Sequence, residues 1–369
     1  MATQVTEERV FNFSAGPAVL PVPVLERIRD EMLCLPGAGA SIMEISHRSK
    51  QFIAVQEQAK ARLMRLLGVG DEHEILFLQG GARLQFSMIP MNLLRGQSAP
   101  AQYVLTGSWG QSALAEAKRE GEVEVIYDAK ETNYDRLPSP SELSTKPDAA
   151  YVHITSNETI QGVQFPADLD LGSVPLVCDS SSDFMYRPYD MSKYGLMYAC
   201  AQKNAGPAGV TVVVIKKELL ARSSASLPGY LNYQTQVEAD SMWNTPPTFA
   251  IYVLGLVAEW LEETIGGLEK MYAINKAKAA VLYDVLDRFP EFYLGHARKE
   301  DRSLMNVTFR FPSEDVEKRF LSESVQHNLD SLKGHRSVGG IRASIYNAMP
   351  MEGVQSLASF MVDFAQKNS

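Results

Sequence analysis

The chain has 369 residues, of which 45% are apolar and 21% are charged, a composition typical of a soluble globular protein with two or three domains. Its formal net charge of −9 excludes the basic surplus of a nucleic-acid-binding domain, so any basic feature must be local, such as a pocket for a small anion. The three cysteines, Cys34, Cys178 and Cys200, are too few and too scattered for a disulfide framework or a zinc site, and they predict a reducing, cytoplasmic location.

The first half of the chain alternates helical and strand-like segments. Ser49–Leu67 has helical spacing and stops at Gly68, as expected of a helix C-cap, and Ser108–Glu120 is a second helical segment. Short apolar segments typical of buried parallel strands are Glu74–Leu78, Gln102–Thr106, Val123–Tyr127, Ala149–Thr155, Val174–Cys178, Leu196–Ala201 and Val210–Ile215. This order predicts an α/β fold with a large, doubly wound, mostly parallel seven-stranded sheet, which we assign to residues 21–255.

The pattern changes after Pro246-Pro247. Thr248–Ile265 predicts a long helix that ends at Gly266-Gly267, and its apolar run of about ten residues is too short to span a membrane. No secretory signal opens the chain, because Met1–Arg9 is polar. The later elements are a helix to Phe289, a strand at Met305–Phe311, a helix opened by Ser313-Glu314-Asp315, a strand near Gly340–Ile345 and a helix to about Lys367. They predict a smaller α/β domain of residues 1–20 and 256–369, facing the large domain across a cleft.

Three features of the large domain suggest chemistry, while phosphate-loop, dinucleotide, zinc-hydrolase and serine-hydrolase motifs are absent from the sequence. The turn Gln79-Gly80-Gly81-Ala82-Arg83 could expose backbone N–H groups to an anion, although a βα turn without function is equally compatible with it. Asp179 follows a strand at the edge where ligands bind in such sheets, or it is simply a helix N-cap. Lys203 follows another strand and precedes a glycine-rich turn, where desolvation would lower the pKa of its amine and favour Schiff-base formation.

Together these features match what a pyridoxal phosphate site needs, namely an anion cradle, a partner for the pyridine nitrogen and an amine for the aldehyde. Several longer motifs resemble those of the phosphoserine aminotransferases, in the same order and over nearly the whole chain. They are Phe13-Ser14-Ala15-Gly16-Pro17-Ala18, Ile45-Ser46-His47-Arg48-Ser49-Lys50, Gln79-Gly80-Gly81, Asn157-Glu158-Thr159-Ile160-Gln161-Gly162, Ala201-Gln202-Lys203-Asn204-Ala205-Gly206-Pro207-Ala208-Gly209, Asn244-Thr245-Pro246-Pro247-Thr248 and His335-Arg336-Ser337-Val338-Gly339-Gly340-Ile341-Arg342-Ala343-Ser344.

The resemblance implies the fold type I of pyridoxal-phosphate enzymes and a role for each matching residue at the cofactor. Lys203 would form the Schiff base and shuttle the proton, Asp179 would keep the pyridine nitrogen protonated, Trp109 would stack on the ring and Thr159 would bond its phenolic oxygen. The cofactor phosphate would be bound by the backbone at Ala82 and Arg83, by Gln202, and by Asn244 and Thr245 of a second subunit. The resemblance therefore implies a homodimer with shared active sites.

For the substrate, the resemblance assigns Arg342 to the α-carboxylate. The side-chain anion would be held by His47 and Arg48 of the partner subunit together with His335 and Arg336, since guanidinium groups suit both carboxylate and phosphate. The implied reaction is transamination between 3-phosphohydroxypyruvate and glutamate, as in serine synthesis, and some relatives also use 4-phosphohydroxy-threonine in vitamin B6 synthesis. The alternatives are a non-catalytic protein that keeps the cofactor site, or a cysteine desulfurase, which needs a mobile nucleophilic cysteine that a buried Cys200 would not provide.

Overall fold

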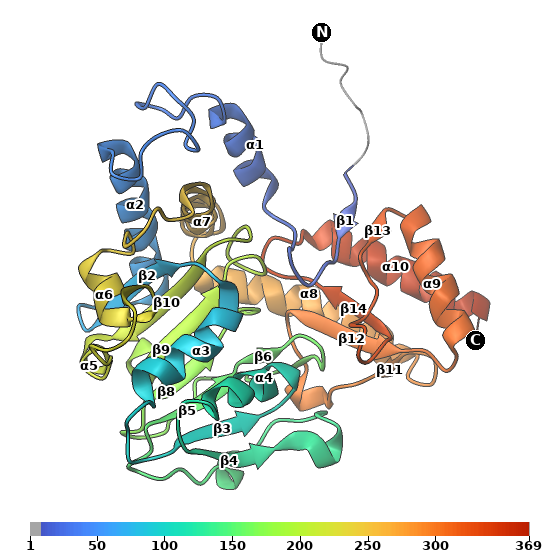
Figure 1. The fold of residues 1–369 in the computed structure, drawn as a ribbon. Helices are drawn as coiled ribbons and strands as arrows, with labels where there is room; N and C mark the ends of the chain where they lie inside the picture. Colours follow the sequence, from blue (N-terminus) through green and yellow to red (C-terminus); the bar gives the residue numbers. More distant parts are fainter. Residues whose placement is uncertain (1–8, 369) are drawn as a thin grey trace.

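The computed structural model describes residues 9–368, which form a large α/β unit and a smaller one beside it (Figure 1). The central sheet has the strand order β2-β10-β9-β8-β5-β3-β4. In that order the strands are His73–Leu78, Thr211–Lys216, Tyr194–Cys200, Leu176–Asp179, Tyr151–Thr155, Ala101–Leu105 and Val123–Asp128. Each predicted strand segment of the first half lies in this sheet, so the predicted fold class is confirmed.

One strand direction differs from the expected pattern. β10 runs antiparallel to both of its neighbours, β9 and β2, whereas the other neighbouring pairs in the sheet are parallel. The reason is the connection 201–210, which joins β9 to β10 without a helix and is too short for a crossover. The chain therefore turns back at the carboxyl end of β9.

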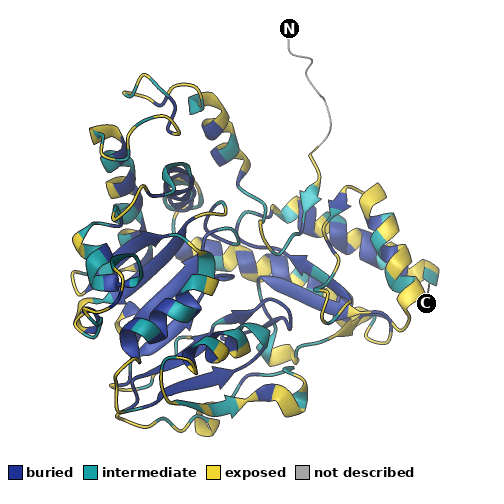
Figure 2. Ribbon diagram, in the orientation of Figure 1, coloured by how far each residue is buried: buried dark blue, intermediate teal, exposed yellow. Residues whose placement is uncertain are grey.

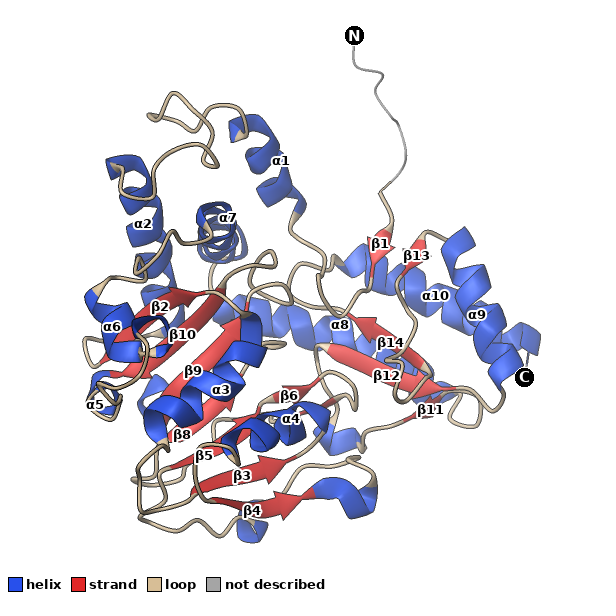
Figure 3. Cartoon of the chain, viewed as in Figure 1, coloured by secondary structure: helices blue, strands red, loops and turns tan. Residues whose placement is uncertain are grey.

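Helices cover both faces of the large sheet (Figure 3). On one face lie α2 (Lys50–Leu67) and α7 (Thr248–Glu259), and on the other lie α3 (Gly81–Leu93) and α4 (Ser108–Ala117). The predicted end of α2 is confirmed, because its C-cap Gly68 has a φ of 65°, in the left-handed region that favours glycine. Shorter helices at the margins are α1 (Val22–Glu31), α5 (Lys217–Leu220) and α6 (Tyr233–Glu238).

The smaller unit is built on a three-stranded antiparallel sheet of β11 (Leu294–Gly295), β12 (Asn306–Arg310) and β14 (Ile341–Ser344). It is covered by α8 (Leu268–Arg288), α9 (Glu314–Gln326) and α10 (Met351–Asn368). Ser313 caps α9 as its sequence suggests, because its hydroxyl accepts the N–H of Val316. The inner strands of the large sheet and β12 of the small one are largely buried, whereas the edge strands β4 and β11 are not (Figure 2).

Two segments connect the units. The N-terminal strand β1 (Phe11–Asn12) pairs with β13 (Leu329–Asp330) of the small unit before the chain enters the large one. The predicted helix Thr248–Ile265 divides into α7 and a π-helical segment, Trp260–Ile265, which ends at Gly266. α8 then packs its first turn in the core of the large unit, through Leu268 and Met271, and its later turns in the core of the small unit.

The remaining elements lie in connections between these layers. The hairpin β6 (Asn157–Glu158) and β7 (Val163–Gln164) follows β5 and faces the small unit. Short 3₁₀ turns lie at Ala129–Thr132, Pro140–Glu142, Met191–Lys193, Gly229–Leu231 and Lys299–Asp301. No helix within residues 9–368 is long and apolar enough to cross a membrane.

Candidate active site

Lys203 lies in the turn that reverses the chain between β9 and β10. Its Nζ is 5.2 Å from the ring centroid of Trp109, which lies in the first turn of α4. The N-terminal segment passes close to Lys203. A Cβ added at Gly16 would lie 3.3 Å from Cγ of Lys203, so a larger residue at this position would press against the Lys203 side chain. The predicted strand-end position of Lys203 is therefore confirmed, and an aromatic face lies beside its amine.

The electrostatic surroundings of Lys203 differ from the expectation. Burial lowers the pKa of its amine, but Cys200, Tyr346, Asp179 and Glu158 act in the opposite direction and together raise it above the usual lysine value. The prediction of a lowered pKa was wrong, because burial was considered without these four acidic groups, of which Cys200 and Tyr346 act most strongly.

Asp179 is the last residue of β8 and is buried. Its Oδ1 accepts the N–H of Ser181 at 3.0 Å, and no helix begins there, so the alternative of a helix N-cap does not apply. Burial raises the pKa of Asp179, while Lys203, Ser181 and Tyr198 partly offset this by stabilising the ionised carboxylate. The buried carboxylate and the Lys203 amine thus influence each other electrostatically at the carboxyl ends of β8 and β9.

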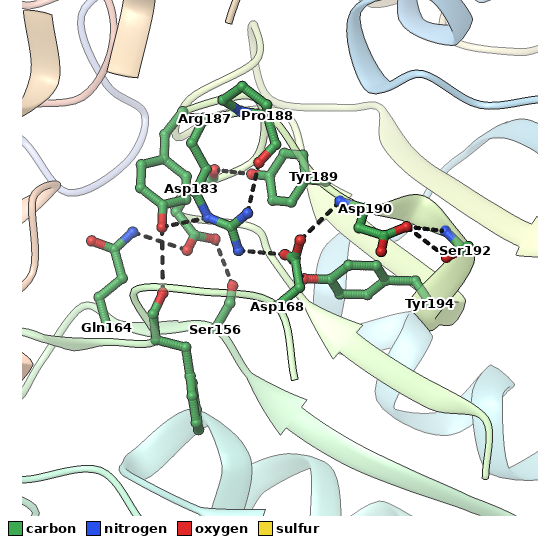
Figure 4. Close-up of polar contacts among 12 residues, drawn as sticks. Ser156, Gln164, Asp168, Asp183, Arg187, Pro188, Tyr189, Asp190, Ser192 and Tyr194 are labelled. Carbon is green, nitrogen blue, oxygen red and sulfur yellow. Dashed lines mark hydrogen bonds and ion pairs between the residues drawn. The ribbon is translucent and has the colours of Figure 1, made fainter. Parts of the chain in front are cut away.

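A buried polar network fixes the segment that follows Asp179 (Figure 4). Asp183 accepts hydrogen bonds from the Ser156 hydroxyl at 2.6 Å and the Gln164 side chain at 3.0 Å, and burial raises its pKa to about 6. Next along the segment, Arg187 forms an ion pair with Asp168, which is also bonded by the Tyr194 hydroxyl. A segment anchored in this way holds the end of β8 in one position.

Glu158 is a functional candidate that the sequence analysis did not single out. It is fully buried, and its two carboxylate oxygens accept the backbone N–H groups of Trp109 at 3.1 Å and Gly110 at 2.9 Å. A Cβ at Gly107 would lie 2.5 Å from the carboxyl carbon, so only glycine admits this approach. Burial raises the pKa of Glu158 to about 7. The Glu in the motif Asn157-Glu158-Thr159 was the only signal in the sequence.

The carboxylate of Glu158 leaves only one of two neighbouring helix N-termini open to an external anion. At α4 it occupies two of the free N–H groups, whereas α3 begins at Gly80 and Gly81, with φ of 84° and 65° and no side-chain cap. Ala82 and Arg83 lie in the first turn of α3, so their N–H groups are free of intrahelical partners. The residues present therefore fit a phosphate at α3.

Trp109 and Thr159 lie together, because the indole N–H donates to the Thr159 hydroxyl at 3.0 Å. Arg83 lies over the same indole, with its guanidinium 5.5 Å from the ring centroid. Gln202 is half-buried beside Lys203, and its carbonyl accepts the N–H of Ala18 at 2.9 Å. An aromatic face, an amine and a buried carboxylate thus surround one region, which suits a flat, charged heteroaromatic group such as pyridoxal phosphate.

The small unit contributes a cationic cluster. Arg342 on β14 reaches the large unit, where its guanidinium donates to the carbonyl of Thr159 at 3.4 Å. Burial and the neighbouring Arg342 and Arg336 lower the pKa of His335, whose Nδ1 lies 2.7 Å from the Ser337 hydroxyl. Three of the predicted substrate residues are thus brought together, and a bound anion would relieve their mutual repulsion.

The other four predicted residues lie on exposed surface segments of this chain. His47 and Arg48 contact each other and Ser46 in the turn before α2. Asn244 and Thr245 are exposed, and the Thr245 carbonyl accepts the side-chain N–H of Gln79 at 3.2 Å. Within one chain, the structure therefore describes no contact of His47 or Arg48 with Lys203 or Arg342.

Comparison with known proteins agrees with this geometry. The family described as aminotransferase class-V matches residues 10–357. The chain is 61% identical to a phosphoserine aminotransferase of Rhodopirellula baltica over 363 residues, covering 98% of this chain and 96% of that protein. The phosphoserine aminotransferase structure from Bacillus circulans subsp. alkalophilus matches with a TM-score of 0.96 and 48% identity, covering 98% and 100% of the two chains. A pyridoxal-phosphate-bound phosphoserine aminotransferase from Trichomonas vaginalis matches with a TM-score of 0.90 and 41% identity, covering 96% and 100%.

Proposed function

The chain belongs to the class-V aminotransferase family, and on that premise we propose that it is a pyridoxal-phosphate-dependent phosphoserine aminotransferase. It would interconvert 3-phosphohydroxypyruvate and glutamate with phosphoserine and 2-oxoglutarate. The observation that carries the proposal is the Lys203 amine over the Trp109 ring, within the electrostatic influence of the Asp179 carboxylate, together with the cationic cluster on the small unit. A desulfurase is disfavoured, because Cys178 and Cys200 are buried in β8 and β9, and the exposed Cys34, which follows α1, has no described contact with the residues around Lys203.

Pyridoxal phosphate, when bound, supplies an aldehyde that captures amines and a protonated ring that accepts electrons from the substrate Cα. The α3 N-terminus would hold its phosphate, and Trp109 would cover its ring. The Asp179 carboxylate would hold a proton on the ring nitrogen, and the Lys203 amine would bond the aldehyde and then move the proton at the substrate Cα. These assignments rest on the geometry above together with the family match.

We further propose that the substrate lies between two domains, residues 21–255 and residues 1–20 with 256–369. Arg342 would bind the α-carboxylate, and His335 and Arg336 would bind the side-chain phosphate or the γ-carboxylate. A phosphate monoester carries about −1.5 to −2 charges at neutral pH, so it can satisfy several cations and raise the pKa of His335 toward protonation. The cationic cluster therefore favours phosphoserine over serine.

Phosphoserine is expected to be transaminated far faster than serine by the purified enzyme, with 2-oxoglutarate as acceptor. Replacing Arg336 with leucine removes one phosphate-binding cation, and kcat/KM for phosphoserine should fall by about 10- to 100-fold, while the cofactor content stays unchanged. The loss should be much smaller for serine, which has no side-chain anion. The measurement is kcat/KM for both amino acids, from the rate of glutamate formation.

Arg119→Leu is the matched control, because Arg119 is exposed at the far end of α4 and pairs only at the surface with Glu116. This variant should retain the native ratio of kcat/KM for phosphoserine to that for serine. An unchanged ratio in Arg336→Leu would show that selectivity lies elsewhere, and failure of the native enzyme to use phosphoserine would refute the proposed function itself.

We also propose that the active form is a homodimer in which each site uses residues of both subunits. His47, Arg48, Asn244 and Thr245 lie on exposed segments, as expected of residues that serve a partner's site. Large apolar side chains are exposed beside them, since Trp243 is 55% and Met43 is 60% accessible. Such apolar groups next to polar functional residues favour a covered surface.

Mixing two inactive variants is expected to restore activity if the sites are shared. One variant is Lys203→Ala, and the other combines Arg48→Ala with Asn244→Ala. Each hybrid dimer would contain one site with all native residues, so a randomised mixture should recover up to about a quarter of native activity, because half of the dimers are hybrids with one working site. Activity is measured after subunit exchange has been verified with differently tagged subunits. No recovery in verified hybrids would contradict shared sites.

A further inference from the structure

A line of buried polar side chains lies next to Asp179, on the face of the sheet that α3 and α4 cover. His153 on β5 and Tyr198 on β9 lie on the two strands that flank β8, and Tyr198 is paired directly with Asp179 in the sheet register. The His153 Nε2 is 3.0 Å from the Tyr198 hydroxyl. Because register partners on neighbouring strands share a face of the sheet, the Tyr198 side chain lies beside that of Asp179, and it helps to lower the pKa of that carboxyl. Neither residue has a role in the mechanism above.

The surroundings of His153 keep its ring in place and neutral. The ring stacks on Tyr103, with centroids 5.0 Å apart and planes 21° from parallel, and the edge of Phe86 on α3 covers Tyr198 at 6.3 Å. Both His153 and Tyr198 are buried, at 1% and 0% exposure. Burial lowers the pKa of His153 to about 3, so the ring is neutral at physiological pH. It then carries an N–H proton on only one of its two nitrogens.

The hydrogen-bond partners decide which nitrogen carries that proton. Nδ1 of His153 is buried and has no partner among the described residues. A proton on Nδ1 would leave a buried N–H donor unsatisfied, whereas a proton on Nε2 is used in the bond to the Tyr198 oxygen. With its oxygen accepting from His153, the Tyr198 hydroxyl can direct its own proton to the carboxylate of Asp179.

We propose that His153 and Tyr198 are positioning residues that form a one-way hydrogen-bond relay, from His153 Nε2–H to the Tyr198 hydroxyl and on to the Asp179 carboxylate. The relay would donate one hydrogen bond to the carboxylate of Asp179. The same carboxylate also accepts the N–H of Ser181, from the segment that follows β8. It would keep Asp179 ionised and fixed in direction despite its burial. The proposal rests on the role assigned to Asp179 in the proposed function.

The first test reads the relay in the protein without cofactor, by nitrogen NMR of histidine-labelled protein. His153 is expected to be the neutral Nε2–H form from pH 5 to 9, and Tyr198→Phe should shift its Nε2 signal. An Nδ1–H form, or a His153 that titrates in this range, would overturn the relay. This measurement does not depend on transaminase activity, so it separates failure of the relay from failure of the proposed function.

The second test compares two variants that each lose one buried hydroxyl. Tyr198→Phe should lower kcat about tenfold or more, with little change in KM, because a hydrogen bond to a charged group is lost. Tyr103→Phe is the matched control, because the Tyr103 hydroxyl bonds Tyr151 at 2.9 Å and lies outside the relay. Its kcat should stay within about twofold of the native value. Equal losses of kcat in both variants would assign Tyr198 a merely structural role.

Two further comparisons guard against a general loss of folding. In an Asp179→Asn background, Tyr198→Phe should cause little additional loss of kcat, because the ionised acceptor is already gone, and a fully additive loss would count against the relay.

At the His153 end of the relay, His153→Gln retains an N–H donor and should preserve kcat much better than His153→Leu. If the two His153 variants were equally impaired while equally stable to heat, donation from His153 would be refuted.

Discussion

Replacing Lys203 with alanine is expected to abolish transamination, with kcat reduced by about 10⁴-fold or more, while the fold is retained. Within residues 9–368, Lys203 is the only lysine whose amine lies over the Trp109 ring and near the Asp179 carboxylate. On the proposed roles, its removal would take away both the covalent partner of the cofactor and the group that moves the substrate proton. The measurements are kcat with phosphoserine and the mass of the chain after borohydride reduction with pyridoxal phosphate.

An exposed lysine provides the comparison for this variant. Lys270→Ala removes an amine near the start of α8 and should retain both activity and borohydride-stable attachment of the cofactor. Thermal unfolding of the two variants checks that they are folded. If the Lys203→Ala protein still gained the mass of one reduced cofactor at a single site, another lysine would have to be the attachment point.

Replacing Asp179 with asparagine is expected to lower kcat by about 10²- to 10⁴-fold, because the ring nitrogen would no longer be held protonated. Asparagine has nearly the same shape as aspartate, so the Ser181 N–H keeps an acceptor and the phosphate at the α3 N-terminus is undisturbed. The cofactor should therefore remain bound. The measurements are single-turnover kinetics and the absorbance of the bound cofactor between pH 5 and 9.

The decisive outcome for Asp179 is the rate of proton transfer at full cofactor occupancy. A variant that binds the cofactor and turns over at nearly the native rate would show that the carboxylate does not control the ring nitrogen. A variant that loses the cofactor is tested again at saturating pyridoxal phosphate, where a native rate would carry the same conclusion.

Strand ends were the most predictable part of the site. Continuous apolar segments mark buried strands, and in such sheets the residues that follow them lie at a common edge, so Asp179 and Lys203 could be placed together from their positions alone. The anion cradle at Gly80-Gly81 followed from the conformations that glycine allows. The roles of Arg342, His335 and Arg336 came instead from the family resemblance, because isolated basic residues carry no local signal.

Properties that depend on contacts between distant segments could not be predicted. The direction of β10 depends on a missing crossover helix, and a strand-by-strand pattern does not encode direction. The raised pKa of Lys203 depends on Cys200 and also on Tyr346, Asp179 and Glu158, and the last three approach it only in the folded chain. The position of Glu158 at the start of α4 and the contact between His153 and Tyr198 also arise only in the folded chain. In the sequence, His153 and Tyr198 suggest ordinary packing residues.

The helix α8 limits how the two units can move relative to each other. Because its first turn is packed in one core and its later turns in the other, a continuous hydrogen-bonded rod joins the two bodies. Such a rod resists bending, and its first turn, which follows the glycines Gly266 and Gly267, is itself held in the large core. Relative rotation of the two units would therefore have to repack Leu268 and Met271, so α8 couples the position of the small unit to the packing of the large one.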